Sequence, residues 1–455
     1  MKNKTENENR TAAKDLTSGP LAKQILFFSL PLMASNILQV LFNMADVAVV
    51  GQFAGSVALG SVGSTTILVA LYTGVLIGIS SGINILVALA MGAGDQKSVT
   101  ETVHTALLIS GMTGVFLLTA GVLSASGILQ FLHTKPELLA GAVIYLRIYL
   151  LGLPALALYN FGNAVLSAAG DTKRPLLYLS AAGVLNVALN LFFVLVCQLA
   201  VAGVALASII SQYVSAFLIL RHLFVCGESY GLRRESLHIN KERAVRILQL
   251  GVPAGLQNAI FYVANLFVQM GVNSFDAVMV AGNSAAANAD NLVYDMMAAF
   301  YTACGSFIGQ NYGAKQKKRI IKSYFLSMFY AFILALVLGV GLVVCGRQFL
   351  SLFSPDSAVI AAGMVRLKIM GFSYCVSAFM DSSIAAARSL GKSLVPTVIV
   401  IMGACVFRVV WIYTVFAHFG TPASLYLLFI CSWTVTAIVG NLYFAKVYRE
   451  AVKAW

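Results

Sequence analysis

The sequence predicts an all-α polytopic membrane protein with twelve transmembrane helices, built as two parallel six-helix repeats around a central cleft. Three observations predict this fold class: the composition, the recurrence of long apolar runs, and an internal repeat. Of the 455 residues, 59% are hydrophobic and 10% are charged, whereas a soluble domain carries roughly 25% charged residues. Too few polar side chains are therefore present to cover a water-facing surface.

Apolar runs long enough to cross a bilayer as a helix, about 20 residues each, recur along the whole chain. Their apolarity is continuous, which favours helices over barrel strands, because barrel strands alternate apolar and polar residues. The polar first 20 residues lack the apolar core of a signal peptide, and we interpret them as a tail. We expect membrane spans at residues 24–48, 62–90, 103–126, 141–167, 176–196, 199–222, 247–272, 287–309, 322–345, 360–386, 394–416 and 425–446.

The distribution of basic residues predicts the orientation in the membrane. The formal net charge is +13, and 24 of the 30 Lys and Arg residues fall in the tails and in the loops expected on the same side. This asymmetry predicts a multi-pass protein of the cell (inner) membrane with both termini in the cytoplasm. No basic patch with interleaved aromatic residues stands on a soluble module, so we expect contact with membrane lipids and no nucleic acid partner.

Short sequence matches recur at nearly constant spacing between the two halves of the chain. Residues 29–43 match residues 251–265 at an offset of 222, and three further matches have nearly the same offset. Each half holds six spans, an even number, so the repeats are parallel and can rock against each other to give alternating access. We therefore expect a cytoplasmic tail (1–20), an N-terminal lobe (21–222), a basic cytoplasmic linker (223–246), a C-terminal lobe (247–447) and a second cytoplasmic tail (448–455).

Motifs of several enzyme classes are missing from the sequence. The seven cysteines are scattered singly without a CxxC pair, so neither zinc nor a redox motif is indicated. The glycine-containing turns near 91–97 and 170–175 lack the spacing of a phosphate loop, and we interpret them as helix ends with glycine caps. We expect no enzymatic activity and no cofactor. Uphill transport would then require an ion gradient.

A carboxylate inside the first span, Asp46, is the first candidate for function, because a charge at mid-membrane costs about 2.5–3.5 kcal/mol on insertion scales. Asn36, Gln39 and Asn43 precede it on nearby turns. Asn36, Asn43 and Asp46 share one side of the helix, which indicates a polar stripe facing the protein interior. The alternative is a carboxylate at the end of the helix that reaches the membrane interface.

The fifth span carries Asn186 and Asn190, four residues apart and so on one face of a helix. We expect them at a depth similar to that of Asp46. One carboxylate and two amide carbonyls are hard oxygen ligands that suit a small cation such as sodium. A proton on Asp46 held by the same amides fits the pattern equally well. Hydrogen bonding between helices is the structural alternative for the asparagine pair.

Polar residues of the second half indicate another centre. Asp290 and Asp295 are expected to begin the eighth span, where a negative charge favours a helix N-terminus, and Tyr294 stands beside Asp295. Asp381 lies in the tenth span and Arg408 in the eleventh. These two residues either form a structural ion pair or line a charged pocket of the C-terminal lobe.

The repeat relates Asn160 to Asp381 and Asn258 to Asn36. The candidates for coupling to a cation are therefore Asp46, Asn43, Asn186 and Asn190, of which Asp46, Asn186 and Asn190 form the possible sodium site. The candidates for binding substrate are Asn36, Gln39, Asn160, Asn258, Tyr294, Asp295, Asp381 and Arg408.

Several of these stretches together resemble the multidrug and toxic compound extrusion (MATE) family of cation-coupled antiporters. They are "NMADVAVVG" after the "LP" of the first span, "GISSGINILVALAMGAGD" in the second, "AAGDTKRPLLY" before the fifth, "GSFIGQNYGAKQKKR" after the eighth and "RSLGKSLVPT" before the eleventh. The resemblance covers residues 20 to 447. It implies a two-lobed pump that exports amphiphilic, often cationic compounds in exchange for sodium or protons.

The same resemblance assigns roles to particular residues. The first-span aspartate of the family corresponds to Asp46, and the fifth-span pair of its DinF-like branch corresponds to Asn186 and Asn190, where the branch has an aspartate in place of Asn190. The NorM-like branch has a seventh-span glutamate that this chain lacks, and its tenth-span aspartate corresponds only roughly to Asp381. The chain is therefore expected nearer the DinF-like branch.

Two other functions fit a membrane protein of this kind. A flippase for a lipid-linked saccharide or peptide would share the two-lobed plan, but it should carry a more basic cleft than Arg408 alone provides. A membrane-embedded enzyme or receptor is the more distant alternative, because an intramembrane metalloenzyme needs clustered His and carboxylate ligands. We expect small amphiphilic substrates and a functional monomer.

Overall fold

A computed structural model describes residues 15–132, 134–453 and 455, and within them the chain is almost entirely helical. Ten helices are long and apolar enough to cross a membrane, and α4 and α5, bent by 45° at a short break, form a further span. Helix α9 is 37 residues long and supplies the remaining crossing, although its sequence is more polar. The predicted fold of twelve helices in two repeats is confirmed.

The first half of the chain forms six crossings. Helices α1 and α6 each continue into a short π-helical segment, and the fourth crossing is the bent pair. The elements are α1 (Leu21–Val49) with η1 (Val50–Ala54), α2 (Gly55–Gly92), α3 (Gln96–Phe131), α4 (Pro136–Leu150), α5 (Leu153–Ala168), α6 (Lys173–Leu191) with η2 (Phe192–Val196), and α7 (Ala200–Val225).

The second half follows a connection that contains one 3-10 turn, η3 (Arg234–Ser236). The eleventh crossing of the protein is one continuous helix from residue 394 to residue 419, in which α-helical and π-helical segments alternate. The elements are α8 (Lys241–Val272), α9 (Ala277–Gly313), α10 (Lys317–Val344), α11 (Gly346–Ser351), α12 (Ser357–Ser389), α13 (Leu394–Val400), η4 (Ile401–Val406), α14 (Phe407–Trp411), η5 (Ile412–Phe416), α15 (Ala417–Phe419) and α16 (Pro422–Lys453).

Helix ends follow local sequence signals. The side chain of Asp95 accepts a hydrogen bond from the Ser98 amide at the start of α3, and Asp276 accepts one from the Met279 amide at the start of α9. These bonds satisfy amide groups that have no partner inside the helix. Gly94, in the turn between α2 and α3, has a positive φ of 69°, which glycine adopts without steric cost.

The start of α9 differs from the prediction. The eighth span was expected to begin at residue 287, whereas α9 begins at Ala277, next to the Asp276 cap. The first ten residues of this helix include several small and polar side chains, which lower the apolarity without breaking the helix. Alanine is the strongest helix former, so the helix extends beyond the apolar stretch that the sequence pattern marks.

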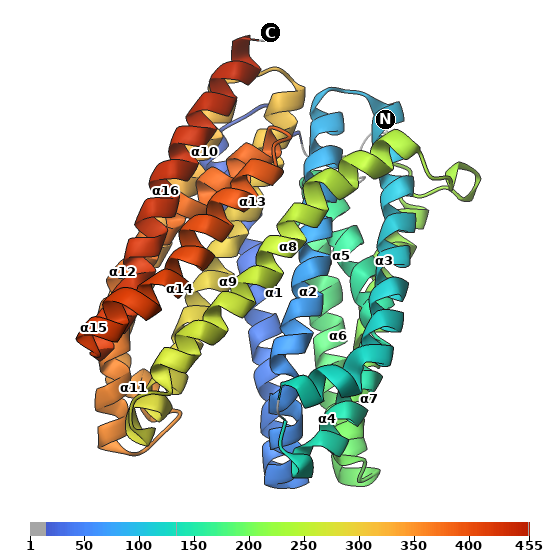
Figure 1. The fold of residues 1–455 in the computed structure, drawn as a ribbon. Coiled ribbons are helices and arrows are strands. Elements are labelled where there is room, and N and C mark those ends of the chain that lie inside the picture. Colours follow the sequence, from blue (N-terminus) through green and yellow to red (C-terminus); the bar gives the residue numbers. More distant parts are fainter. Residues whose placement is uncertain (1–14, 133, 454) are drawn as a thin grey trace, which may run out of the picture.

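The two halves meet at the end of the bundle that carries both chain termini, which we call the terminal end, and diverge toward the opposite end, the far end (Figure 1). Helix α8 runs diagonally between them and packs closely against α2. A Cβ atom at Gly78 of α2 would lie 2.1 Å from the backbone nitrogen of Gly255 on α8. Small residues permit such backbone contact between membrane helices, so glycine pairs hold the two halves together.

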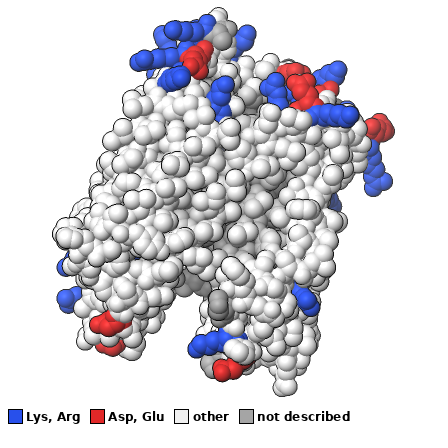
Figure 2. Space-filling model, in the orientation of Figure 1, with Lys and Arg blue, Asp and Glu red and all other residues white. Residues whose placement is uncertain are grey.

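Charged side chains gather at the ends of the molecule. Figure 2 shows Lys and Arg concentrated at the terminal end, a broad uncharged band around the middle, and a hollow between two limbs at the far end. Large apolar side chains of α3 are exposed, among them Phe116 at 69% and Leu123 at 80%. Such exposure is expected where lipid rather than water surrounds the protein.

Candidate functional site

The structure brings together Asp46 on α1, Asn190 on α6 and Ser208 on α7. The Asn190 side-chain amide donates one hydrogen bond to Asp46 Oδ1 and one to Asn186 Oδ1, at 3.1 Å for the latter. The Ser208 hydroxyl donates to Asp46 Oδ2 at 3.2 Å. Both asparagines are buried. The carboxylate predicted from the first span and the amides predicted from the fifth therefore form one polar centre.

This centre has an electrostatic property that suits a cation. None of the ion pairs among the described residues includes Asp46, so its two oxygens interact only with neutral donors. Asn190 Oδ1 is buried and has no hydrogen-bond partner among residues 15–132, 134–453 and 455. A carboxylate held by neutral groups and accompanied by a spare carbonyl oxygen can bind a proton or a small hard cation. The sequence prediction did not include Ser208, because nothing in the sequence distinguishes it from the other serines of α7.

The polar side chains along α1 lie in two different environments. Gln39 and Asn43 are exposed. Asn36 instead donates a hydrogen bond of 2.6 Å to the main-chain oxygen of Asp295 on α9. Its repeat counterpart Asn258, on α8, donates to the main-chain oxygen of Gly74 on α2 at 3.1 Å. Both asparagines therefore connect the two halves through backbone atoms.

A second polar centre lies inside the second half. Asp290 of α9 forms an ion pair with Arg366 of α12 and accepts a hydrogen bond from the Tyr374 hydroxyl. Arg366 also donates to Asn283, whose oxygen accepts from the Tyr426 hydroxyl at 3.1 Å. The prediction that Asp290 begins a helix is wrong, because α9 starts thirteen residues earlier, at Ala277. The sequence prediction did not identify Arg366 as the partner of Asp290. The only signal for it in the sequence is that a basic residue lies within an apolar span.

Arg408 is fully buried, and it does not pair with Asp381. Its guanidinium donates to Asn265 Oδ1 at 2.9 Å and to the Ser432 hydroxyl at 3.5 Å. The group lies between the rings of Phe261 and Phe429, with centroid distances of 4.6 and 4.7 Å. The predicted structural ion pair with Asp381 is therefore wrong, since α8 and α16 supply the groups that contact Arg408.

The remaining predicted residues occupy separate positions. Asp381 interacts electrostatically with Arg388 and Arg408, and Arg388 itself donates to Gln257 at 2.6 Å. Tyr294 packs edge-on against Trp433 at 5.7 Å. The Asn160 side-chain nitrogen is buried, and none of the residues that the structure describes forms a hydrogen bond with it.

The terminal end is closed by residues 15–19, a segment that we call the strap. The Leu16 amide donates to Gln310 Oε1 at 3.1 Å, and the Leu16 carbonyl accepts from Asn311 at 3.2 Å. Arg319 of α10 donates to the carbonyls of Leu16, Ser18 and Gly19 at 2.9–3.1 Å. The chain that leads into α1 is thus bound to α9 and α10 of the second half.

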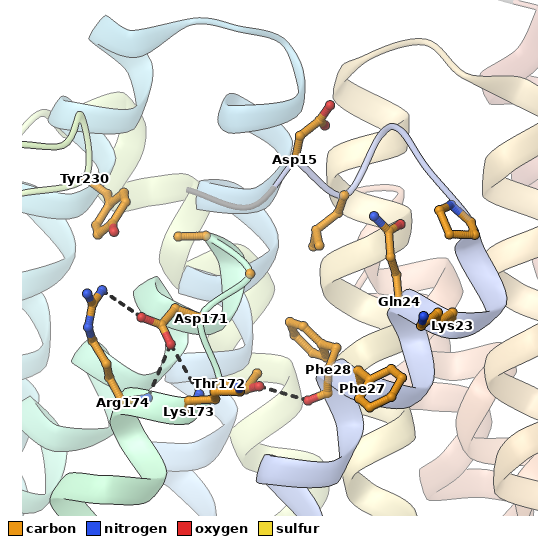
Figure 3. Close-up of a pocket in the computed structure, with 14 residues that line it drawn as sticks. Asp15, Lys23, Gln24, Phe27, Phe28, Asp171, Thr172, Lys173, Arg174 and Tyr230 are labelled. Atoms are coloured by element: carbon orange, nitrogen blue, oxygen red, sulfur yellow. Dashed lines mark hydrogen bonds and ion pairs between the residues drawn. The ribbon is translucent and has the colours of Figure 1, made fainter. Parts of the chain in front are cut away.

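A cavity of about 640 Å³ lies beside the strap (Figure 3). Its walls are the start of α1 and the turn between α5 and α6. Figure 3 shows the Thr172 hydroxyl bonded to the Phe28 carbonyl, at 3.0 Å, and Asp171 bonded to Arg174. These bonds join the α5–α6 turn to α1 on the inner side of the closed end.

A helical membrane protein with two parallel repeats, a carboxylate within a span of the first, buried charged residues in the second and a hollow between them has the architecture of a secondary transporter. The family model described as MatE matches residues 31–192 and 253–414. The two matches begin 222 residues apart, which agrees with the offset of the repeat. The chain belongs to the MATE family of membrane transporters.

Named relatives agree with this assignment. The chain is 28% identical to the "Probable multidrug resistance protein YpnP" of Bacillus subtilis, over 80% of this chain and 81% of that protein. It is 25% identical to the "Probable multidrug resistance protein NorM" of Thermotoga maritima, over 83% and 82%. A solved structure described as the outward-facing conformation of a multidrug resistance MATE family transporter superimposes with a TM-score of 0.89, at 23% identity, over 96% and 98% of the two chains.

Proposed function

We propose that this protein is a cation-coupled antiporter that exports small amphiphilic compounds by alternating access. The observation that carries the proposal is the centre around Asp46, where a membrane carboxylate meets Asn190 and Ser208 without a cationic partner. Retaining such a group costs free energy in an apolar span. A coupling ion that binds and leaves in each transport cycle explains why the carboxylate is kept.

The coupling ion is sodium or a proton. Sodium would use Asp46 oxygens together with the carbonyl oxygens of Asn186 and Asn190, because it prefers hard oxygen ligands. The spare Asn190 oxygen is already placed beside the carboxylate. A proton would need only Asp46, with the amides and Ser208 hydrogen-bonded to the neutral acid. In both cases the charge of the centre changes, and so do its contacts between α1, α6 and α7.

The structure supports an outward-open state within this scheme. The strap and the glycine contacts close the terminal end, and the halves diverge at the far end. The concentration of Lys and Arg at the terminal end supports a cytoplasmic location for this end, by the positive-inside rule. Ion binding at Asp46 from outside would then precede closure of the far end and release of the ion inside.

The proposal is tested in liposomes that contain the purified protein, a cationic amphiphilic dye and an imposed sodium or pH gradient. We expect one of the two gradients to drive dye movement. Asp46→Asn should lower the gradient-driven rate at least about tenfold, because the charge that binds the ion is lost, and Asp46→Glu should restore part of it. Dye movement that ignores both gradients would refute antiport, and an unchanged Asp46→Asn rate would remove Asp46 from the mechanism.

A further inference from the structure

Of the buried side-chain hydrogen-bond donors of the second half that have no partner among the described residues, three belong to residues that lie close together. They are Arg408 Nη2 of α14, Trp433 Nε1 of α16 and the Tyr294 hydroxyl of α9. The Arg408 side chain is 0% exposed and Trp433 is 1% exposed. Buried polar atoms in folded proteins nearly always have a partner, so three unpartnered donors in one region call for a physical reason.

The three donors are neighbours in space, although they come from three different helices. The Arg408 guanidinium lies 6.0 Å from the centre of the Trp433 ring. The ring of Tyr294 meets the ring of Trp433 edge-on at 5.7 Å. Phe261 and Phe429 cover the two sides of the guanidinium. The result is a cluster of aromatic side chains around the buried Arg408 guanidinium.

Two of the three groups can only donate hydrogen bonds. Arginine and the tryptophan indole donate hydrogen bonds and cannot accept them. Arg366, which is also buried in the same half, differs from Arg408 in its charge partner, because it pairs with Asp290 and bonds to Asn283. Arg408 contacts only the neutral oxygens of Asn265 and Ser432. Its positive charge is therefore left without a contacting carboxylate in the described part of the chain.

We propose that Arg408, Trp433 and Tyr294 form a binding site for an anionic oxygen group, and that the group is a carboxylate of the transported compound. The charge and donor geometry of arginine suit a carboxylate, and the rings of Phe261 and Phe429 suit the apolar part of the same molecule. The preferred cargo is then an amphiphile that carries a carboxylate, rather than a purely cationic one. This inference rests on the export function proposed above and specifies its substrate.

The position of the cluster is compatible with access from the cleft. Asn265 and Phe261 lie on α8, which separates the cluster from α2 of the first half. Figure 1 shows α8 crossing between α2 and α14. A displacement of α8 during the rocking motion would therefore change the wall that covers Arg408. The site is placed where the alternating cycle can expose and cover it.

The test uses a rhodamine dye with a free carboxylate and its methyl ester, which differ by that one charge. Binding of each dye to the purified protein is measured by fluorescence polarisation, and transport of each is measured in the liposomes described above. We expect the wild-type protein to bind the carboxylate dye more tightly than the ester. Arg408→Gln should weaken binding of the carboxylate dye about tenfold or more and leave the ester unchanged.

Trp433→Phe provides a second variant that keeps an aromatic side chain but removes the N–H donor together with one ring of the indole. Trp433→Phe should reduce the preference for the carboxylate dye several-fold. If Arg408→Gln does not fold, Trp433→Phe by itself tests whether the cluster binds the carboxylate. Equal binding of both dyes to the wild type, or an unchanged preference in Trp433→Phe with folded protein, would overturn the inference.

Two further outcomes separate the possible explanations. If chloride alone removes the preference when it replaces a bulky organic anion in the buffer, the site takes a free inorganic anion and the assignment to the cargo is overturned. If the wild type transports neither dye under either ion gradient, the export function fails. Gradient-driven transport of both dyes without a preference would refute the carboxylate site and leave export intact.

Discussion

Arg319 provides the most direct test of how the terminal end stays closed. The side chain extends from α10 and donates hydrogen bonds to three main-chain carbonyls of the strap, at Leu16, Ser18 and Gly19. A fourth bond, of 3.1 Å, reaches Asn311. In the proposed alternating-access cycle, opening the terminal end requires the strap to leave the second half. The three bonds to the strap would then exist in the closed state and break in the open state, whereas the bond to Asn311 lies within the second half.

The expected loss of stability of the closed state follows from the number and type of these hydrogen bonds. A hydrogen bond to a charged group contributes about 1.5–3 kcal/mol when it is removed, and partial exposure to water lowers that figure. Arg319→Gln keeps a donor but loses the charge and most of the reach. We therefore expect the closed state to lose about 2–4 kcal/mol, which is a shift of roughly 30- to 1,000-fold in the equilibrium between the two states.

The assay measures the distance between the two limbs at the far end. Spin labels on cysteines introduced at Val57 of the first half and Leu352 of the second, both exposed, report this distance in a variant without native cysteines. Arg319→Gln should raise the population with the shorter distance. Lys318→Gln is the matched control, because it removes a neighbouring exposed charge. Unchanged distances in Arg319→Gln, or an equal change in Lys318→Gln, would refute the closing role.

Two substitutions test the packing of the bundle. Gly78→Ala places a Cβ atom 2.1 Å from the Gly255 nitrogen; overpacking of this kind costs about 1–3 kcal/mol and should lower the apparent Tm in detergent. Asp290→Asn leaves the buried guanidinium of Arg366 without its carboxylate, which should cost about 3–5 kcal/mol and lower both the Tm and the yield of folded protein.

Matched variants separate these effects from general damage. Gly111→Ala adds a Cβ atom within α3 where no atom of a neighbouring helix lies within 4 Å. Its Tm should not fall, because alanine favours the helix more than glycine does, and an equal loss there would contradict the packing argument. Replacing Asp290 by Leu together with Arg366 by Met removes both charges and should recover much of the stability. A double variant as unstable as Asp290→Asn would contradict the ion-pair explanation.

The centre around Asp46 could be anticipated because its signals are local. A carboxylate in an apolar span is conspicuous by composition, and Asn186 and Asn190 share a helix face by their spacing. The depth of each helix in the membrane follows from span boundaries, so Asp46 and the amides were expected at one level. Ser208 could not be found in this way, because serine is common in membrane helices and only the rotation of α7 about its axis brings it to Asp46.

The sequence by itself determined the helical fold class and the parallel repeat, because hydrophobic length and internal similarity are properties of the chain order. The partners of the buried charges were decided only by the tertiary structure. Asp290 pairs with Arg366, whereas Arg408 forms an ion pair with no carboxylate in the described part of the chain, although the sequence had suggested Asp381 as its partner. The physical reason is that an ion pair forms only when its two groups lie within about 4 Å of each other. The rotation and tilt of neighbouring helices decide which groups come that close, and the order of residues along the chain does not specify rotation or tilt.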